Sequence, residues 1–92
     1  MDNPVEGSVR IELFGPFRKF GAERDLSLGG PVRYEELLAA IEADLGPAFG
    51  EQARRTNTTV IVNNRIASRK SLETLKIVPG DRVAFALLMG GG

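Results

Sequence analysis

The sequence predicts a single α+β domain in which several strands surround one main helix. Near the N-terminus the apolar residues Val9, Ile11 and Leu13 alternate with polar ones, a pattern typical of a strand with one buried face, and an apolar strand-like run lies near the other end of the chain. Between these segments, from about Arg33, apolar residues recur at helical spacing, and Gly-Pro pairs separate the elements. The 92 residues suffice for one domain. Folding should bury about 60–65% of the unfolded surface, which leaves no spare core for a deep pocket.

The first part of the chain is expected to form two antiparallel strands joined by a loop. The first strand should run over residues 8–14, and the Gly-Pro pair at residues 15–16 should end it. Phe17 and Phe20 are expected to tuck under the loop that follows. Residues 25–28 supply a second short strand, which ends at a Gly-Gly-Pro segment.

The main helix is expected from about Arg33 to the Gly46-Pro47 pair. Its apolar stripe consists of Tyr34, Leu37, Leu38, Ile41 and Leu45. Glu35 and Glu36 lie in the first turn, where the positive end of the helix dipole favours acidic side chains. Adjacent residues on a helix diverge, so this acidic pair is interpreted as a solvated face and not as an acid–base site.

The middle of the chain combines one ambiguous segment with one clear hairpin. Residues 47–57 form either a loop or a broken second helix, anchored by Phe49, and have no assigned role. Residues 58–62 are rich in β-branched side chains and predict a strand. The Asn pair at residues 63–64 tolerates the positive φ angles of a two-residue turn, so residues 65–67 should form the return strand.

The last elements lead to an apolar strand. Leu72 and Leu75 fit one helical turn of packing, and residues 79–81 indicate a tight turn with proline first and glycine second. The final strand is expected over residues 82–88.

Both faces of this final strand are apolar. If Val83, Phe85 and Leu87 face the helix, the pleat places three residues on the outer face, namely Ala84, Ala86 and Leu88. An exposed apolar strip of this kind is a candidate docking surface for a partner protein. The alternative is that loop residues such as Phe14 or Phe17 cover it.

The composition excludes several functions. Twelve basic and twelve acidic side chains cancel, and no basic cluster, such as Arg54-Arg55, is longer than two residues, so nucleic-acid binding is not expected. Cysteine and histidine are absent, which removes disulfides, zinc fingers, iron-sulfur clusters and thiol or imidazole catalysis, and no metal site is expected. Residues 1–7 lack the features of a signal peptide or membrane span, which favours a flexible leader on a cytoplasmic protein.

The chain closes with Met89 and three glycines placed directly after the final strand. Because glycine has no Cβ, residues 89–92 should form a flexible tail that can enter a slot too narrow for any side chain. Such a tail could present the carboxylate of Gly92 to a partner enzyme. The alternative is a featureless frayed end or a remnant of cloning.

Taken in order, these elements resemble the MoaD/ThiS family of ubiquitin-like sulfur carriers. The segments that carry the resemblance are Leu13-Phe14 followed by Arg18 and Gly21, residues 60–63, residues 79–85 and the terminal Gly91-Gly92. The resemblance extends from about Val9 to the end of the chain. It implies a β-grasp domain over residues 8–88, with a mixed sheet of four to five strands packed on one main helix. The first and last strands would lie parallel at the centre of the sheet.

The resemblance also implies a function. In such carriers an E1-like adenylating enzyme uses ATP to activate the C-terminal carboxylate, here that of Gly92 next to Gly91. A sulfur donor then converts the acyl-adenylate to a thiocarboxylate, which passes its sulfur to the large subunit of an acceptor synthase. The carrier itself would bind no cofactor and have no self-contained active site. Contacts with the partner are expected from Ala84, Ala86, Leu88, Met89 and Gly90.

The pathway that the carrier serves is predicted from finer similarities. Its length, the loop after Gly15 and residues 81–85 are more similar to the small subunit of molybdopterin synthase than to the shorter thiamine carriers, which favours molybdenum cofactor biosynthesis. Two features depart from that pattern. Residues 87–89 replace a proline-containing stretch, and the chain ends in three glycines instead of two.

Three alternatives to a molybdopterin carrier stay open. A thiamine-type carrier would use the same chemistry with another acceptor. A ubiquitin-like modifier would end in an isopeptide bond between Gly92 and a lysine, and would produce conjugates of high molecular weight. In a plain interaction module, changes to the glycine tail would leave the function intact.

Overall fold

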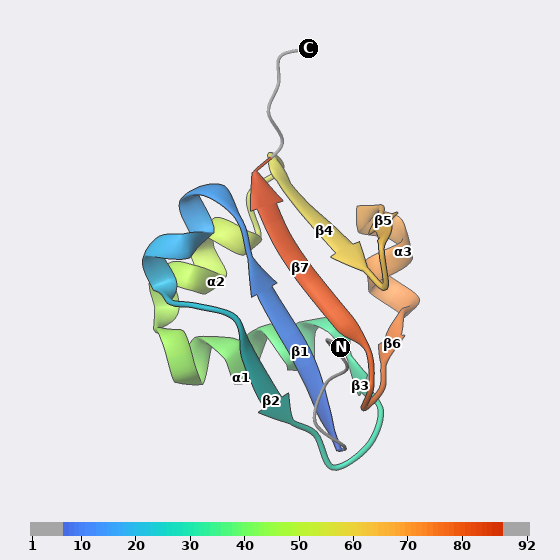
Figure 1. Cartoon of the computed structure of the whole chain (residues 1–92). Coiled ribbons are helices and arrows are strands. Elements are labelled where there is room, and N and C mark those ends of the chain that lie inside the picture. The colour runs from blue at the N-terminus through green and yellow to red at the C-terminus, as the bar shows by residue number, and fades with distance from the viewer. Residues whose placement is uncertain (1–6, 88–92) are drawn as a thin grey trace.

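The computed structural model describes residues 7–87, and these form a five-stranded mixed sheet with helices packed on one face (Figure 1). The strand order is β2-β1-β7-β4-β5. The strands are β1 (Ser8–Leu13), β2 (Arg24–Ser27), β4 (Thr58–Val62), β5 (Arg65–Ala67) and β7 (Arg82–Leu87). The first and last strands, β1 and β7, are parallel and adjacent, and the other pairs are antiparallel. The predicted mixed sheet with a parallel central pair is therefore confirmed.

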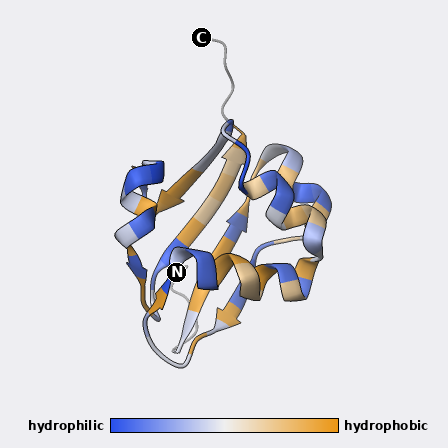
Figure 2. Ribbon diagram, turned by 180° about the vertical axis from the view of Figure 1, so that it is seen from behind, coloured by the Kyte–Doolittle hydropathy of each residue, from blue (hydrophilic) through white to orange (hydrophobic). Residues whose placement is uncertain are grey.

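The helices cover the face of the sheet that is turned away from the viewer in Figure 1. They are α1 (Tyr34–Leu45), α2 (Pro47–Ala53) and α3 (Arg69–Thr74). Figure 2, seen from behind, shows α1 in front of the sheet. A 3-10 helix, η1 (Gly15–Phe20), follows β1, and two short strands, β3 (Val32–Arg33) and β6 (Lys76–Ile77), pair beside the start of α1. The sequence pattern did not predict η1, β3 or β6.

The core lies between the sheet and α1. Its fully buried side chains include Val9, Ile11, Phe17, Leu37, Leu38, Phe49, Ile77, Val83 and Phe85. Four phenylalanines form one cluster in it. The ring of Phe49 lies 5.0 Å from that of Phe85 in an edge-to-face arrangement, and Phe17 lies 5.9 Å from Phe85. This cluster, with Phe20 at its margin, fixes η1 and α2 against β7.

Local sequence explains where α1 begins and ends. The carboxylate of Glu36 accepts a hydrogen bond from the backbone N–H of Arg33 at 2.7 Å, which satisfies a donor before the first turn. Glu35 instead pairs with Arg54 at 3.0 Å, so the two glutamates serve different partners, as predicted. At the other end Gly46 has φ 106°, a conformation that favours glycine, and Pro47 starts α2 at a position that tolerates proline. Residues 47–53 are thus a second helix, one of the two predicted alternatives.

Two turns lie together at the end of the sheet where β7 begins. Asn63 and Asn64 have φ angles of 50° and 71°, which confirms the predicted hairpin turn between β4 and β5. Asp81 joins this turn to the one before β7, because its carboxylate accepts from the side-chain amide of Asn63 at 3.0 Å and from the N–H of Val78 at 2.9 Å. These bonds hold the start of β7 in place.

The predicted leader contributes one described residue. The carbonyl oxygen of Gly7 accepts a hydrogen bond from the N–H of Leu28 at 2.9 Å, and residues 1–6 lie outside the described part of the chain. Within residues 7–87, no helix has the length and apolar character needed to cross a membrane.

Candidate partner-binding site

The candidate site is built around the C-terminal end of β7. This strand lies between β1 and β4, and Leu87 at its end is in register with Thr58 at the start of β4. The predicted site residues Leu88, Met89, Gly90, Gly91 and Gly92 lie outside the described residues. The geometry of the site therefore comes from β7 itself and from the surface beside it.

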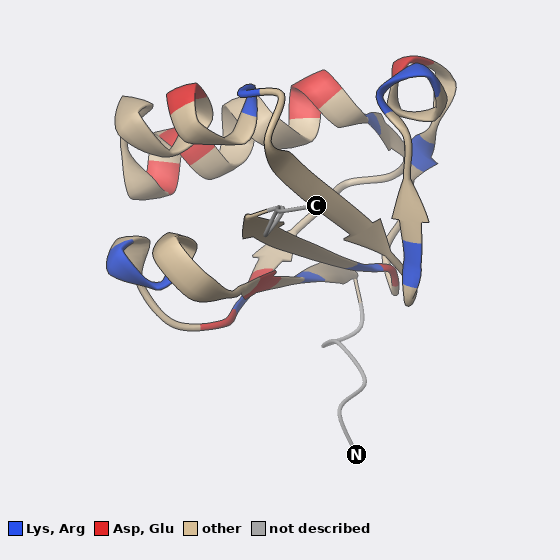
Figure 3. Ribbon diagram, turned by 90° about the horizontal axis from the view of Figure 1, so that it is seen from above, with Lys and Arg blue, Asp and Glu red and all other residues tan. Residues whose placement is uncertain are grey.

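The two faces of β7 have different environments, as the alternation predicted. Val83 and Phe85 are fully buried and belong to the core between sheet and helices. Ala84 is buried as well but is not a member of that core, because it points to the opposite, outer face of the sheet. Ala86 shares this outer face and is half-buried. Figure 3 shows the layer of α-helices above the sheet, on the side opposite the outer face.

Neighbouring strands shield Ala84. It is in register with Glu12 of β1 and Ile61 of β4, whose longer side chains stand on either side of it. Glu12 is itself held by Arg82, with 2.9 Å between a guanidinium nitrogen and a carboxylate oxygen. Ala84 therefore contributes little exposed area, and the accessible part of the predicted strip within residues 7–87 is Ala86.

Exposed apolar side chains extend the surface around Ala86. We define the outer patch as Phe14, Ile61, Ile66 and Ala86. Phe14 is 40% exposed and Ile66 is 75% exposed, while Ile61 lies between Ala84 and Ile66 in the strand register. The docking surface predicted from the sequence did not include Ile61 or Ile66. The strand alternation of residues 58–62 nevertheless places Ile61 on the face opposite that of the core residue Val60.

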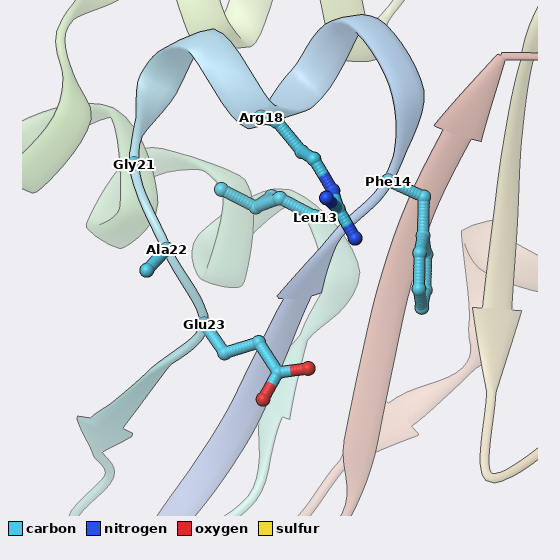
Figure 4. A pocket seen from close by; sticks show the side chains of 6 residues that line it. All are labelled: Leu13, Phe14, Arg18, Gly21, Ala22 and Glu23. Atoms are coloured by element: carbon cyan, nitrogen blue, oxygen red, sulfur yellow. The ribbon is translucent and has the colours of Figure 1, made fainter.

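The alternative that loop phenylalanines cover the strip is resolved by their positions. Phe17 is fully buried in the core, so it does not cover the outer face. Phe14 follows β1 directly, and its backbone N–H donates to the carbonyl oxygen of Phe85 at 3.0 Å. Its ring lies on the outer side of β7 (Figure 4) but stays accessible. Phe14 is therefore part of the outer patch.

A hollow adjoins the outer patch on the side of η1. It has a volume of about 630 Å³ and is lined by Leu13, Phe14, Arg18, Gly21, Ala22 and Glu23 (Figure 4). Four of these residues, Leu13, Phe14, Arg18 and Gly21, also carry the family resemblance in the sequence. They are separated by up to eight positions in the chain and line one hollow. Arg18 and Glu23 place opposite charges at its two ends.

Ion pairs lie beside the hollow and along the edge strand β2. Arg10 on β1 contacts Asp25 at 2.8 Å and Glu23 at 3.2 Å, which ties the edge strand β2 and the loop before it to the sheet. Arg24 contacts Asp44 of α1 at 2.6 Å. These pairs are partly exposed, so each contributes at most about 1 kcal/mol to stability, and their main effect is to fix the loop.

Two ionisable groups of the described residues have a clearly shifted pKa. Within residues 7–87, no group of three His, Cys, Asp or Glu side chains is close enough together to hold a metal ion. The clearest perturbed pKa in this part belongs to Tyr34, at the start of α1, where burial raises the pKa of the hydroxyl well above its ordinary value. The hydrogen bonds from Arg54 to Glu35 and Glu42 raise the pKa of that guanidinium. Both groups keep their protons at neutral pH and lie on the helical side.

A mixed five-stranded sheet on one main helix, with parallel central strands and an outer face that no helix or strand of residues 7–87 covers, defines a ubiquitin-like β-grasp domain. The model of the ThiS family matches residues 11–92, and the chain belongs to this family. It is accordingly a ubiquitin-like sulfur carrier, as the resemblance implied. The closer similarity to the small subunit of molybdopterin synthase stays a prediction.

Solved structures agree on the fold. The thiamine biosynthesis protein ThiS of Geobacter metallireducens aligns with a TM-score of 0.59 and 21% identity, over 92% of this chain and 99% of that one. The HVO 2177 protein of Haloferax volcanii aligns with a TM-score of 0.70 and 17% identity, over 100% of this chain and 94% of that one. A search of curated protein sequences gave no significant match.

Proposed function

We propose that this carrier is activated at the carboxylate of Gly92. An E1-like adenylating enzyme joins this carboxylate to the α-phosphate of ATP and releases pyrophosphate. A carboxylate is a poor electrophile, and adenylation gives its carbonyl carbon a good leaving group. Sulfide delivered by a sulfur donor then attacks this carbon, the bond from the carbon to the phosphate oxygen breaks, AMP leaves, and the chain carries a thiocarboxylate. The carrier provides the reactive end and the docking surface, and the partner provides the catalytic groups.

One observation carries the proposal: the family match includes the whole glycine segment and begins within β1. Five residues, 88–92, follow the last described residue of β7. An extended segment of that length spans at most about 18 Å, which sets the reach of the carboxylate from the end of β7 into a docked partner. Gly90, Gly91 and Gly92 have no side chains to obstruct a narrow entrance.

The proposed docking surface is the outer face beside β7. Ala84, Ala86, Leu88, Met89 and Gly90 are the partner contacts that we predict from the sequence. The exposure of Phe14 and Ile66 supports the same face: Phe14 follows β1 beside the end of β7, and Ile66 lies in register with Ile61 and, through it, with Ala84. The small side chain of Ala86 would let a partner approach the sheet closely.

We propose the large subunit of molybdopterin synthase as the acceptor, on the basis of the segment after Gly15 and residues 81–85. A thiamine-type acceptor is the second candidate. The name of the matched family and that of the Geobacter protein favour it. Transfer assays with each acceptor, started from the purified thiocarboxylate form, distinguish the two by which product receives sulfur.

The activation step is tested by mixing the chain with the E1-like adenylating enzyme of its source organism and ATP. We expect release of pyrophosphate that depends on the chain. A control chain that ends at Met89 should melt at the same temperature and release none. Equal release from the control, or none from the full chain, contradicts the proposal.

A further inference from the structure

We infer that the hollow beside η1 binds a carboxylate side chain of the activating partner, and that Arg18 forms the ion pair with it. This inference rests on the proposed function, because it concerns the same partner. It adds a polar contact point to the apolar docking surface.

The fold fixes the position of Arg18. Phe17 is anchored in the aromatic cluster, so the next residue of this tight helix points outward. The N–H of Gly21 donates to the carbonyl oxygen of Arg18 at 3.0 Å and closes the segment. Figure 4 shows the Arg18 side chain extending from η1 toward the space between Leu13 and Phe14.

The opposite wall is also fixed. At Gly21, where φ is +137°, a Cβ atom would lie 2.3 Å from a guanidinium nitrogen of Arg24. Arg24 in turn is held by Asp44 at 2.6 Å. The positive φ of Gly21 favours glycine at this position, and Gly21 itself lines the hollow.

The two charged side chains that line the hollow, Arg18 and Glu23, differ in their ion-pair partners. The guanidinium of Arg18 makes no hydrogen bond or ion pair with any residue of the described part, 7–87, whereas Arg10 and Arg24 contact carboxylates there. Glu23, at the other end, is bound by Arg10 at 3.2 Å. Arg18 is thus a charged side chain of the hollow for which residues 7–87 supply no partner, whereas Glu23 shares Arg10 with Asp25.

The shape and charge of the hollow indicate which side chain of a partner it can bind. The floor is apolar, with Leu13, Phe14 and Ala22, so it suits a side chain with an apolar stem. A single carboxylate matches one guanidinium, and the nearby carboxylate of Glu23 repels a singly charged group less than a doubly charged phosphate. Phe14 belongs to both the hollow and the outer patch, so a partner seated on the patch also covers the hollow. A glutamate or aspartate on the partner surface meets these conditions.

The test compares two charge reversals in one segment. Arg18→Glu is compared with Lys19→Glu, a neighbouring exposed cation that does not line the hollow. Binding to the E1-like enzyme is measured by calorimetry after circular dichroism has verified folding. We expect Arg18→Glu to weaken binding by about tenfold or more, as for a close charge pair across an interface, and Lys19→Glu to change it by less than about twofold. For Arg18→Ala, the loss of affinity relative to wild type should shrink as salt is raised.

Each outcome is informative. Equal affinities of wild type and Arg18→Glu, or equal losses for Arg18→Glu and Lys19→Glu, overturn the inference and leave the proposed function intact. A loss for Arg18→Ala that is independent of salt also overturns it, because the contact would then not be an ion pair. Failure of the wild-type chain to bind and to be adenylated contradicts the proposed function itself.

Discussion

The backbone N–H of Phe14 donates a hydrogen bond to the carbonyl oxygen of Phe85 at 3.0 Å. This bond continues the parallel pairing of β1 and β7 by one residue beyond Leu13. It holds the exposed ring of Phe14 beside the outer side of β7, where Ala86 follows, while the ring of Phe85 enters the core. The part of the outer patch formed by Phe14 and Ala86 is therefore anchored on the central strand pair β1 and β7.

Ala86→Glu should weaken binding to the E1-like enzyme while the domain stays folded. Ala86 is half-buried on the outer face, so an isolated domain can hold a glutamate there with its carboxylate in water. A docked partner would desolvate that carboxylate without pairing it, at a cost of about 2–4 kcal/mol. Calorimetric titration against the enzyme gives the change in affinity.

The matched control is Ala43→Glu, the same change at an exposed alanine on α1. It should leave the affinity unchanged, because α1 lies on the opposite side of the sheet. Thermal melting of both variants shows whether folding is intact. If Ala86→Glu unfolds the domain, or binds as well as the control, the outer face is not the docking surface.

The elements that the sequence predicted best are those with a strong local signal. The strand at Thr58–Val62 has a run of β-branched residues, and the turn after it has Asn63 and Asn64, which accept positive φ. The helix α1 followed directly from its apolar period. In these segments local preference and tertiary packing favour the same conformation.

The features that the sequence did not predict depend on contacts between distant residues. Pro47 indicated the end of one helix and is also the first residue of the next, because proline lacks only a donor that is unused there. The burial of Ala84 depends on its register with Glu12 and Ile61, which no local pattern contains. The hollow likewise depends on how η1 folds back toward β1.

Gly46→Ala should lower the free energy of unfolding by about 1–3 kcal/mol, because φ 106° and ψ 161° at this position are accessible almost only to glycine. No atom lies within 4 Å of the added Cβ, so the effect comes from the backbone alone. Gly29→Ala is the control, since it also adds a methyl group to open space but at ordinary φ. Urea unfolding should show Gly29→Ala as stable as wild type or about 0.4–1 kcal/mol more stable. Similar free energies of unfolding for the two variants would show that the backbone conformation of Gly46 does not require glycine.

A tag fused after Gly92 should abolish adenylation and leave the melting temperature nearly unchanged. The tag converts the carboxylate into an amide, which cannot attack ATP, and it lies after the β-grasp core. The same tag before Met1 is the control and should permit adenylation. Normal adenylation of the C-terminally tagged chain, without processing back to Gly92, would falsify the carrier mechanism.

The third glycine gives a test of tail length. Deletion of Gly92 leaves two terminal glycines but shortens the reach by roughly 3.3–3.6 Å, and a misplacement of about 1 Å can lower a rate on the order of a hundredfold. Gly91→Ala keeps the length but adds a methyl group and restricts φ. Both variants should fold normally and release pyrophosphate slowly. Wild-type rates for both would show that neither length nor bare backbone matters.

The central claim is that this chain carries sulfur on Gly92, and mass analysis of the C-terminal peptide tests it most directly. The protein should be purified from its own cells in a strain that lacks the acceptor, so that the charged form accumulates. We predict a peptide that ends at Gly92 and is heavier by the replacement of one oxygen by sulfur. A peptide found only as the free carboxylate, or joined through Gly92 to a lysine, would contradict the account.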